Sequence, residues 1–163
     1  MLIGIPKEIL DEEKRVAALP ETVARLVGMG FEVVVESSAG GGVFRTDAEY
    51  EAAGARIEPD VHALYERADI ILKVKQPCMN HQLNRHEAEM IRPGSMLICF
   101  LHPAAPANQS VVRTLRERRV TSLTMDGIPR ISRAQTMDAL TSMSTVTGYR
   151  SVLLAASHFP RFV

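Results

Sequence analysis

Several features that would assign the chain to a particular class of protein are missing. Lysine and arginine number 19, aspartate and glutamate also 19, and the formal net charge at pH 7 is zero. This balance provides no electrostatic attraction to nucleic acid or to an anionic membrane. No apolar stretch approaches the ~18 residues of a membrane-spanning helix, and the N-terminus MLIGIPKE becomes charged too early for a signal peptide. We therefore expect no nucleic-acid partner and no direct membrane insertion.

Cysteine is scarce, and the common phosphate-binding motifs are missing. Cys78 and Cys99 lie on different segments, outside any CxxC or His/Cys cluster. This favours two reduced, buried thiols and predicts no metal. Three glycines at 40–42 follow a strand-like segment, but their spacing is neither GxGxxG nor that of a P-loop. A tight turn beside a ligand cleft is the favoured interpretation, and the 163 residues hold no usual dinucleotide fingerprint.

What the chain does contain is a regular alternation of apolar, strand-like segments with amphipathic, helix-like ones. Strands are expected at 2–5, 31–36, 56–58, 69–75, 95–101 and 120–125. Helices are expected at 20–28, 47–53, 61–67, 82–91 and 108–119, with a long final helix from about Thr136. The alternation predicts an α/β fold, an open doubly wound and mostly parallel sheet with helices on both faces. The nearly all-apolar strands 69–75 and 95–101 should be buried on both sides.

Polar side chains follow several of these strands. Lys73 and Lys75 end one strand, on the same face, and His102 ends the next. A polar loop, within the stretch 128–150, follows the last strand, and a charged loop at 7–15 follows the first. Because carboxyl ends of parallel strands share one edge, where α/β proteins bind ligands, these groups should converge there. Solvated lysines and an ordinary strand-end histidine are the alternatives.

Five segments together resemble one protein family. They are IGIPKE at 3–8, RVA at 15–17, the glycines at 40–42, ILKVKQP at 71–77 and PRISRAQTMDAL at 129–140. In order and with compatible spacing, they are similar to the N-terminal part of the alanine dehydrogenase and proton-translocating NAD(P) transhydrogenase family. PRISRAQ and the later GYR at 148–150 resemble the alpha subunit of the transhydrogenase branch in particular.

The resemblance implies a cofactor and a set of contacts. In the family this domain pairs with a Rossmann NAD-binding domain, so residues 1–128 would be the α/β domain and 129–163 a nucleotide-contacting loop and connecting helix. Arg130, Gln135 and Asp138 match a loop that holds the nicotinamide end of NAD(H) and faces the component that binds NADP(H). Gln135 and Asp138 would serve catalysis by positioning. The full set of expected cofactor contacts is Arg130, Ile131, Ser132, Arg133, Gln135, Asp138 and Thr141, the last standing where serine is usual.

The resemblance also implies an assembly. A homodimer, an NADP(H)-binding subunit and a membrane subunit are expected as partners. The location would be cytoplasmic, at the periphery of the inner membrane. Because the Rossmann fingerprint is missing, we expect the 163 residues to be an N-terminal fragment without turnover of its own.

Two alternatives remain open. Arg15, Lys75 and His102 match positions of alanine dehydrogenases, where the arginine and lysine bind pyruvate and the histidine is the acid/base. An alanine dehydrogenase-like oxidoreductase would therefore use His102 as a catalytic residue. The other alternative is a non-catalytic dimerisation or regulatory module. In each case a helix over 151–163, ending near Pro160, could contact a partner through Val152, Leu153 and Ala156.

Overall fold

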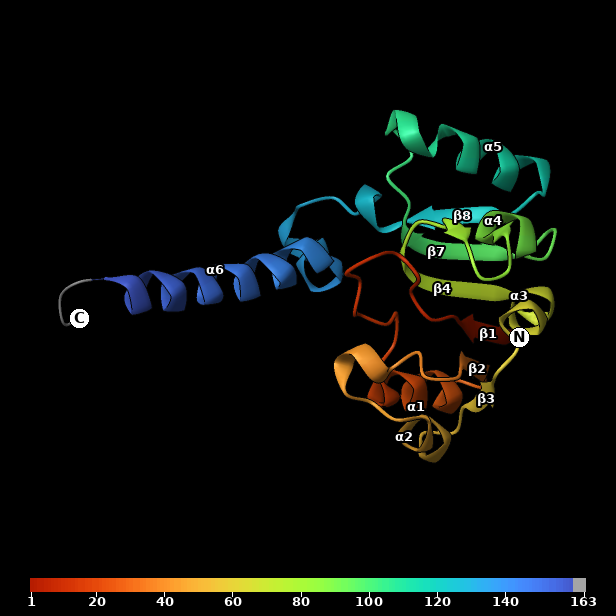
Figure 1. Ribbon diagram of the computed structural model, residues 1–163, viewed down its shortest axis with the longest axis horizontal. Helices are drawn as coiled ribbons and strands as arrows, with labels where there is room; N and C mark the ends of the chain where they lie inside the picture. Colours follow the sequence, from red (N-terminus) through yellow and green to blue (C-terminus); the bar gives the residue numbers. More distant parts are fainter. Residues whose placement is uncertain (160–163) are drawn as a thin grey trace. The chain divides into compact units, whose positions relative to one another are not determined.

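The structure, a computed structural model that describes residues 1–159, contains the predicted parallel α/β sheet (Figure 1). Six parallel strands lie in the order β3-β2-β1-β4-β7-β8. Their bounds are β1 (Leu2–Ile5), β2 (Glu32–Glu36), β3 (Arg56–Glu58), β4 (Ile70–Lys75), β7 (Met96–Phe100) and β8 (Thr121–Thr124). The helices are α1 (Pro20–Gly28), α2 (Asp47–Ala52), α3 (Val61–Arg67), α4 (Glu87–Met90), α5 (Gln109–Glu117) and α6 (Ala139–His158). The order reverses between β1 and β4, as in doubly wound folds.

The chain divides into two compact units. The first, Met1–Asp126, contains the whole sheet. The second begins at Gly127 and contains the 3-10 helix Ser132–Met137 followed by α6. That the second unit leads toward a nucleotide-binding domain stays a prediction.

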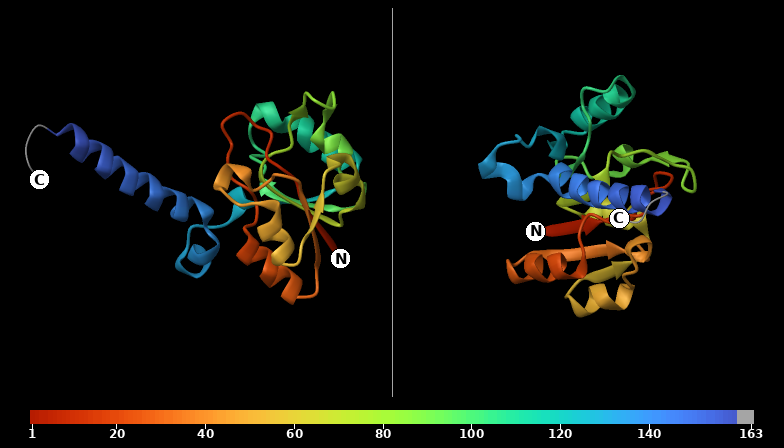
Figure 2. Two further views of the ribbon diagram at one scale, coloured as in Figure 1. Left: turned by 60° about the horizontal axis from the view of Figure 1, so that its bottom comes forward. Right: turned by 90° about the vertical axis from the view of Figure 1, so that its left-hand side faces the viewer.

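Helices cover both faces of the sheet because successive strand residues point to opposite sides (Figure 2). Val33 and Val35 of β2 pack in one core, which includes Val23 of α1 and Tyr50 of α2. Val34 faces the other core, formed with α3, α4 and α5. The prediction that β4 and β7 are buried on both sides was wrong, since each alternates between buried and half-buried residues. In both strands the apolar residues that are fully buried face the helices α3 to α5.

The helix predicted at 82–91 was also wrong. Residues 79–86 form a two-stranded antiparallel hairpin, β5 (Met79–Asn80) with β6 (Arg85–His86), and only the short α4 follows. The side chain of Asn80 explains the difference, because its Oδ1 accepts the N–H groups of Gln82 and Leu83, both at 3.0 Å. Local hydrogen bonds of this kind compete with those of a helix. Asn84 also adopts a left-handed φ of 49°, which is incompatible with a continuous α-helix through this position.

The final helix begins three residues later than expected. Residues 132–137 form a 3-10 helix, and α6 starts at Ala139 because Asp138 caps it. The helix ends at His158, and the predicted continuation through Pro160 to Val163 lies outside the described residues. Val152 and Leu153 are exposed on α6.

The two cysteines are free thiols, as predicted, but only one is fully buried. Cys99 lies in the core of the sheet, whereas Cys78 is half-buried. Burial raises the pKa of the Cys99 thiol to about 12 and that of Cys78 to about 11. Both thiols are therefore protonated near neutral pH, and neither resembles a reactive cysteine.

The glycines at 40–42 form a tight 3-10 turn, Gly41–Val43, after β2. A Cβ atom at Gly42 would lie 2.3 Å from the carbonyl oxygen of Lys14. Only glycine therefore permits the turn to approach the loop that follows β1. This contact supports the loop that carries Arg15.

The position of Lys73 contradicts the expectation that its side chain points, with that of Lys75, toward a ligand. Its side chain is 1% exposed, with Nζ 2.9 Å from Oε1 of Glu87 and 3.4 Å from Oε2 of Glu8. The strand is irregular between Leu72 and Lys75, which disturbs the alternation on which the expectation relied. We call Lys73, Glu8 and Glu87 the buried ion cluster.

The buried ion cluster joins segments that are distant in the sequence. Oε1 of Glu8 accepts the N–H of Val74 at 2.6 Å, and Tyr65 of α3 donates its hydroxyl to Glu87 at 2.7 Å. Burial raises the pKa of Glu8. Burial alone would lower the pKa of Lys73, but the two carboxylates more than offset it and hold that pKa above its ordinary value. The ammonium thus stays charged inside the protein.

Removing the Lys73 charge should destabilise the fold strongly. In Lys73→Met the side-chain length is nearly kept, but two buried carboxylates lose their cation, so we expect the free energy of unfolding to fall by about 3–5 kcal/mol. Urea denaturation measures the change. The control is Lys75→Met, two residues along the same strand and only half-buried, which should cost less than about 1 kcal/mol. Equal losses in the two variants would contradict a structural role for the cluster.

Candidate functional site

A hollow of about 220 Å³ lies within the second unit. It is lined by Arg130, Ile131, Ser132, Gln135, Asp138 and Thr141. All six were among the cofactor contacts expected from the sequence. We call the space that they line the loop hollow. Arg133, the seventh expected contact, is exposed and does not line it.

The 3-10 helix Ser132–Met137 presents these polar groups. It begins where Ala134 donates its N–H to the carbonyl of Ile131 at 2.9 Å, and Ala134 itself is buried. The small apolar residue anchors the turn, so its polar neighbours remain outside. The 3-10 helix ends where Asp138 donates its N–H to the carbonyl of Gln135 at 3.3 Å.

Asp138 has both a structural role and a place in the loop hollow. Its Oδ1 accepts the N–H of Leu140 at 3.0 Å, and its Oδ2 accepts the hydroxyl of Thr141 at 2.6 Å. The Thr141 hydroxyl is the main cause that lowers the pKa of Asp138, and the nearby Arg130 lowers it further. The carboxylate is therefore ionised at neutral pH and fixed at the start of α6, where negative charge is favourable. Threonine, in place of the serine that the resemblance implies, supplies the hydroxyl for this hydrogen bond.

Gln135 differs from Asp138 in being exposed. Its amide has no hydrogen-bond partner among the residues that the structure describes. One donor group and one acceptor group thus face the loop hollow beside the fixed carboxylate and the Arg130 guanidinium. This set can hold a polar, planar group that needs both kinds of partner, and the carboxamide of a nicotinamide is such a group.

A second arrangement of polar groups lies at the carboxyl edge of the sheet, in the first unit. His102 follows β7 with a left-handed φ of 47°, and its Nδ1 lies 2.8 Å from Oδ1 of Asp126. The backbone N–H of His102 also bonds to Oδ2 of Asp126 at 2.7 Å, and the ring of Phe100 stacks on the imidazole at 6.3 Å. The aspartate fixes the orientation of the ring, in which Nε2 is the nitrogen that does not contact it.

Asp126 did not stand out in the sequence. Partial burial would raise its pKa, but hydrogen bonds from the Thr124 hydroxyl and the His102 N–H lower that pKa below its ordinary value. The signal was available, because an aspartate just after β8 must lie beside the end of the neighbouring β7.

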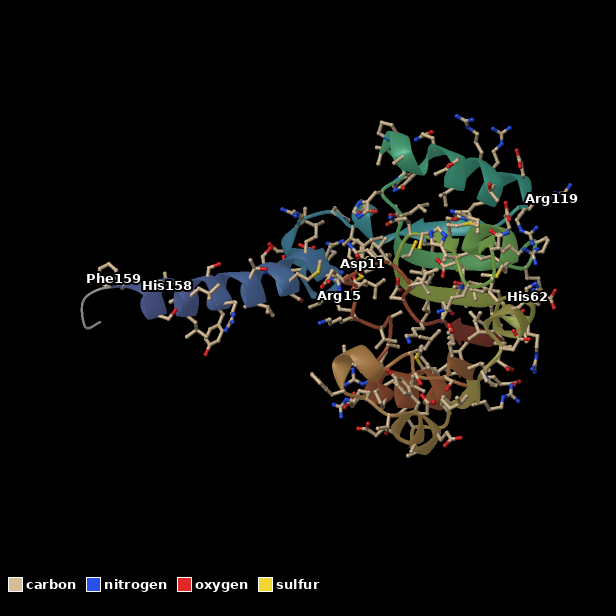
Figure 3. All side chains as sticks on the ribbon, viewed as in Figure 1. Asp11, Arg15, His62, Arg119, His158 and Phe159 are labelled. Carbon is tan, nitrogen blue, oxygen red and sulfur yellow. The ribbon has the colours of Figure 1, made fainter. Side chains whose placement is uncertain are left out.

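Arg15 contacts a carboxylate that also did not stand out in the sequence, that of Glu13. The Arg15 guanidinium, on the loop after β1 (Figure 3), contacts both oxygens of Glu13, with Nε 2.7 Å from Oε1 and NH2 2.5 Å from Oε2. These bonds, with a smaller effect of Lys75, lower the pKa of Glu13 to about 2. Lys75 is paired in register with Phe100, two residues before His102. The structure thus brings Arg15 into contact with Glu13, near which Lys75 acts only as a further charge, whereas it brings His102 to Asp126 and Phe100.

Clusters of metal-binding side chains and long apolar helices are absent from residues 1–159. No group of three or more histidine, cysteine, aspartate or glutamate side chains in that range could hold a metal ion. None of the helices described there is long and apolar enough to cross a membrane.

The chain is similar to known proteins over nearly its whole length. The profile of the family described as "Alanine dehydrogenase/PNT, N-terminal domain" matches residues 4–147. The "NAD(P) transhydrogenase subunit alpha" of Cereibacter sphaeroides is 43% identical over 162 residues, which cover 99% of this chain and 29% of that protein.

Solved structures agree with this assignment. The transhydrogenase from Sinorhizobium meliloti superposes with a TM-score of 0.85 at 37% identity, covering 99% of this chain and 46% of that one. An L-alanine dehydrogenase superposes with a TM-score of 0.81 at 30% identity, covering 96% of this chain and 40% of that one. The chain thus spans less than half the length of each relative. By its sequence and its fold, the chain belongs to the alanine dehydrogenase and pyridine nucleotide transhydrogenase family, whose N-terminal domain it represents, with the transhydrogenase alpha subunit among its relatives.

Proposed function

We propose that the chain forms part of the NAD(H)-binding side of an NAD(P) transhydrogenase, which transfers hydride between NAD(H) and NADP(H). The observation that carries the proposal is the loop hollow, in which a fixed carboxylate, an exposed amide and a guanidinium face the same space. The similarity to transhydrogenase alpha subunits over 99% of the chain supports it. NADP(H) would be bound by a partner component.

The residues of the loop hollow would act by positioning. A bound nicotinamide nucleotide supplies the hydride carrier, and hydride transfer requires close alignment of the two reacting rings. Gln135 can donate to and accept from the carboxamide, while ionised Asp138 can accept from a ribose hydroxyl. Arg130 can hold the loop or an anionic group of the cofactor. None of these side chains has to give or take a proton.

The assembly belongs to the proposal as well. A chain with this role would work as a homodimer with NADP(H)-binding and membrane subunits, at the cytoplasmic surface of the inner membrane. The relative from Cereibacter sphaeroides is named as a subunit, which supports the existence of partners.

A second candidate function is supported by the His102–Asp126 pair. An alanine dehydrogenase-like enzyme would hold the carboxylate and carbonyl of a 2-oxo acid with Arg15 and Lys75. His102 would move a proton at Nε2, while Asp126 holds Nδ1. The bidentate contact of Arg15 with Glu13 weighs against this function, because a substrate carboxylate would have to share or displace it. We therefore place it second.

The 163 residues by themselves should bind NADH weakly. The loop hollow can contact only one end of the cofactor, and the chain has no GxGxxG fingerprint for the pyrophosphate. We expect a dissociation constant above about 10 μM, which corresponds to a binding free energy on the order of −7 kcal/mol or weaker. Isothermal titration calorimetry with the isolated chain measures it. Tighter binding would show that the chain holds the nucleotide without a Rossmann domain.

Shortening Gln135 should impair transhydrogenation. In Gln135→Asn the amide is kept but withdrawn by one methylene, and a displacement of about 1 Å can lower a rate by up to about 100-fold. The assay is NADPH-dependent reduction of an NAD analogue. It uses a chimera in which this chain replaces the matching 162 residues of the Cereibacter sphaeroides subunit, assembled with its partners. Gln109→Asn, on α5 of the first unit, is the matched control and should leave the rate unchanged. Equal rates for the two variants would exclude Gln135 from the site.

Replacing His102 separates the two candidate functions. In the same chimera, His102→Ala should leave transhydrogenation within about twofold, because hydride transfer between nucleotides needs no proton donor. If the second candidate is right, pyruvate- and ammonia-dependent oxidation of NADH is present and falls about 100-fold or more in the variant. Asp126→Asn should reproduce the loss in part, because it removes only the orienting carboxylate. A large loss of transhydrogenation in His102→Ala would contradict our assignment of roles.

A further inference from the structure

A hollow of about 640 Å³ lies in the first unit. Four segments line it, at residues 7–9, 36–38, 59–61 and 79–83. The first three lie at or just after the ends of β1, β2 and β3, and the fourth comprises β5 and the turn that follows it. None of Arg15, Lys75 and His102 is among them. Its volume is in the usual range for small-molecule sites, and its position at the carboxyl ends of parallel strands is where α/β folds bind ligands. We call it the edge hollow.

The wall formed by the hairpin is firmly held. Asn80 is buried and closes the turn through its side chain. Arg85 of β6 lies 2.6 Å from Nε2 of His62 on α3, which is labelled in Figure 3. The buried ion cluster fixes another part of the lining, since Glu8 is one of its members and also lines the edge hollow. The lining therefore comes from several segments that are tied to the rest of the first unit.

The charges that line the edge hollow favour a cation. Its lining includes three carboxylates, those of Glu8, Glu36 and Asp60, together with one lysine, Lys7, and the imidazole of His81. Glu8 already neutralises Lys73, and Asp60 accepts the N–H of His62 at 2.9 Å to cap α3. Glu36 is different. Its Oε2 accepts the backbone N–H of Lys7 at 2.7 Å, and among the described residues its carboxylate has no other hydrogen bond.

The environment of Glu36 shows that, within residues 1–159, it lacks a close counter-ion. Burial raises its pKa, and the lysines Lys73 and Lys7 only partly oppose this effect. A positive group placed beside the free oxygen would gain a charge-assisted hydrogen bond. An anion would instead meet three carboxylates, so ligands such as phosphates or carboxylic acids are disfavoured.

Apolar side chains complete the surface. Ile9, Met79 and Leu83 are 36%, 37% and 46% exposed and come from two different segments that line the edge hollow. Apolar surface of this kind suits an aliphatic stem, while Glu36 suits the charged end of the same molecule. The combination distinguishes an alkylammonium ion from a metal ion, which would gain nothing from the apolar contacts.

We propose that the edge hollow binds a primary ammonium group on a short aliphatic stem, with Glu36 as its counter-ion. The chemistry has two sources, a free alkylamine or the side chain of a lysine in a partner protein. The proposal does not depend on the transhydrogenase assignment, because it involves none of the residues of the loop hollow.

A titration followed by amide chemical shifts tests the proposal on the 163-residue chain. The probes are n-pentylamine, pentanoate and Nα-acetyl-lysine methylamide. We expect saturable shifts of residues 7–9, 36–38, 59–61 and 79–83 with the amines, at about millimolar concentration, and none with pentanoate. Response to pentylamine alone would identify a free amine as the source, and a stronger response to the lysine derivative would identify a protein. Absence of saturable shifts, equal binding of pentanoate, or shifts centred elsewhere would overturn the proposal.

Two variants assign the counter-ion. Glu36→Gln keeps an acceptor for the Lys7 N–H but removes the charge, and should weaken amine binding about tenfold. Glu32→Gln, on the same strand but exposed and paired with Arg56, is the matched control and should bind like the parent chain. Should Glu36→Gln not fold, Leu83→Gln changes only an exposed apolar contact and should weaken binding several-fold. Unchanged affinity in a folded Glu36→Gln or, failing that, in Leu83→Gln would overturn the proposal.

Discussion

The first unit depends on one buried ammonium held between two carboxylates. A charge without water is stable only if its partners are in place, and Lys73 finds them on two segments that are far from it in the sequence. Glu8 connects Lys73 to the loop after β1, and Glu87 connects it to the start of α4. Tyr65 of α3 adds a hydrogen bond to Glu87. The same Glu8 carboxylate accepts the N–H groups of Val74 and Lys75, so it fixes the end of β4 where β1 no longer accompanies it. Both the edge hollow and the Arg15–Glu13 pair are built on segments that this interaction holds.

In the second unit, Asp138 connects local structure with the proposed function. A helix leaves its first N–H groups without intrahelical partners, and Asp138 satisfies one of them while its other oxygen binds Thr141. The residue that decides where α6 begins is therefore the residue whose carboxylate lines the loop hollow. An early start of the helix at Thr136, as the sequence pattern indicates, would place Gln135 and Asp138 on a helical surface rather than around a hollow. The competition between capping and helix propagation thus creates the site.

Much of the fold could be predicted from the sequence because apolar periodicity is a local property. Every expected strand is present in the structure, including short ones such as β3, although the β5–β6 hairpin was not expected. The failures arose where long-range or side-chain contacts decide. Periodicity placed Lys73 on the same face of the strand as Lys75. In the structure β4 is irregular between the two residues, and Lys73 is buried between two carboxylates from other segments. Asn80 diverted a helix into a hairpin through two hydrogen bonds that a pattern of polarity does not contain. For the candidate site, the contacts at 130–141 came from the resemblance, whereas Asp126 and Glu13 emerged only from the structure.

The two candidate chemistries differ in whether a proton has to move. The loop hollow combines a guanidinium and an amide with a carboxylate whose pKa is lowered by the Thr141 hydroxyl. That carboxylate is therefore ionised at neutral pH, which suits a step in which a hydride moves and no proton does. The second candidate instead requires a proton donor and acceptor, the role that it gives to the imidazole of His102. The two sets also belong to separate units of the chain, 1–126 and 127 onward, so neither needs the other for its local geometry. A loop that positions without moving a proton can consequently serve hydride transfer whether or not the histidine pair takes part in any reaction.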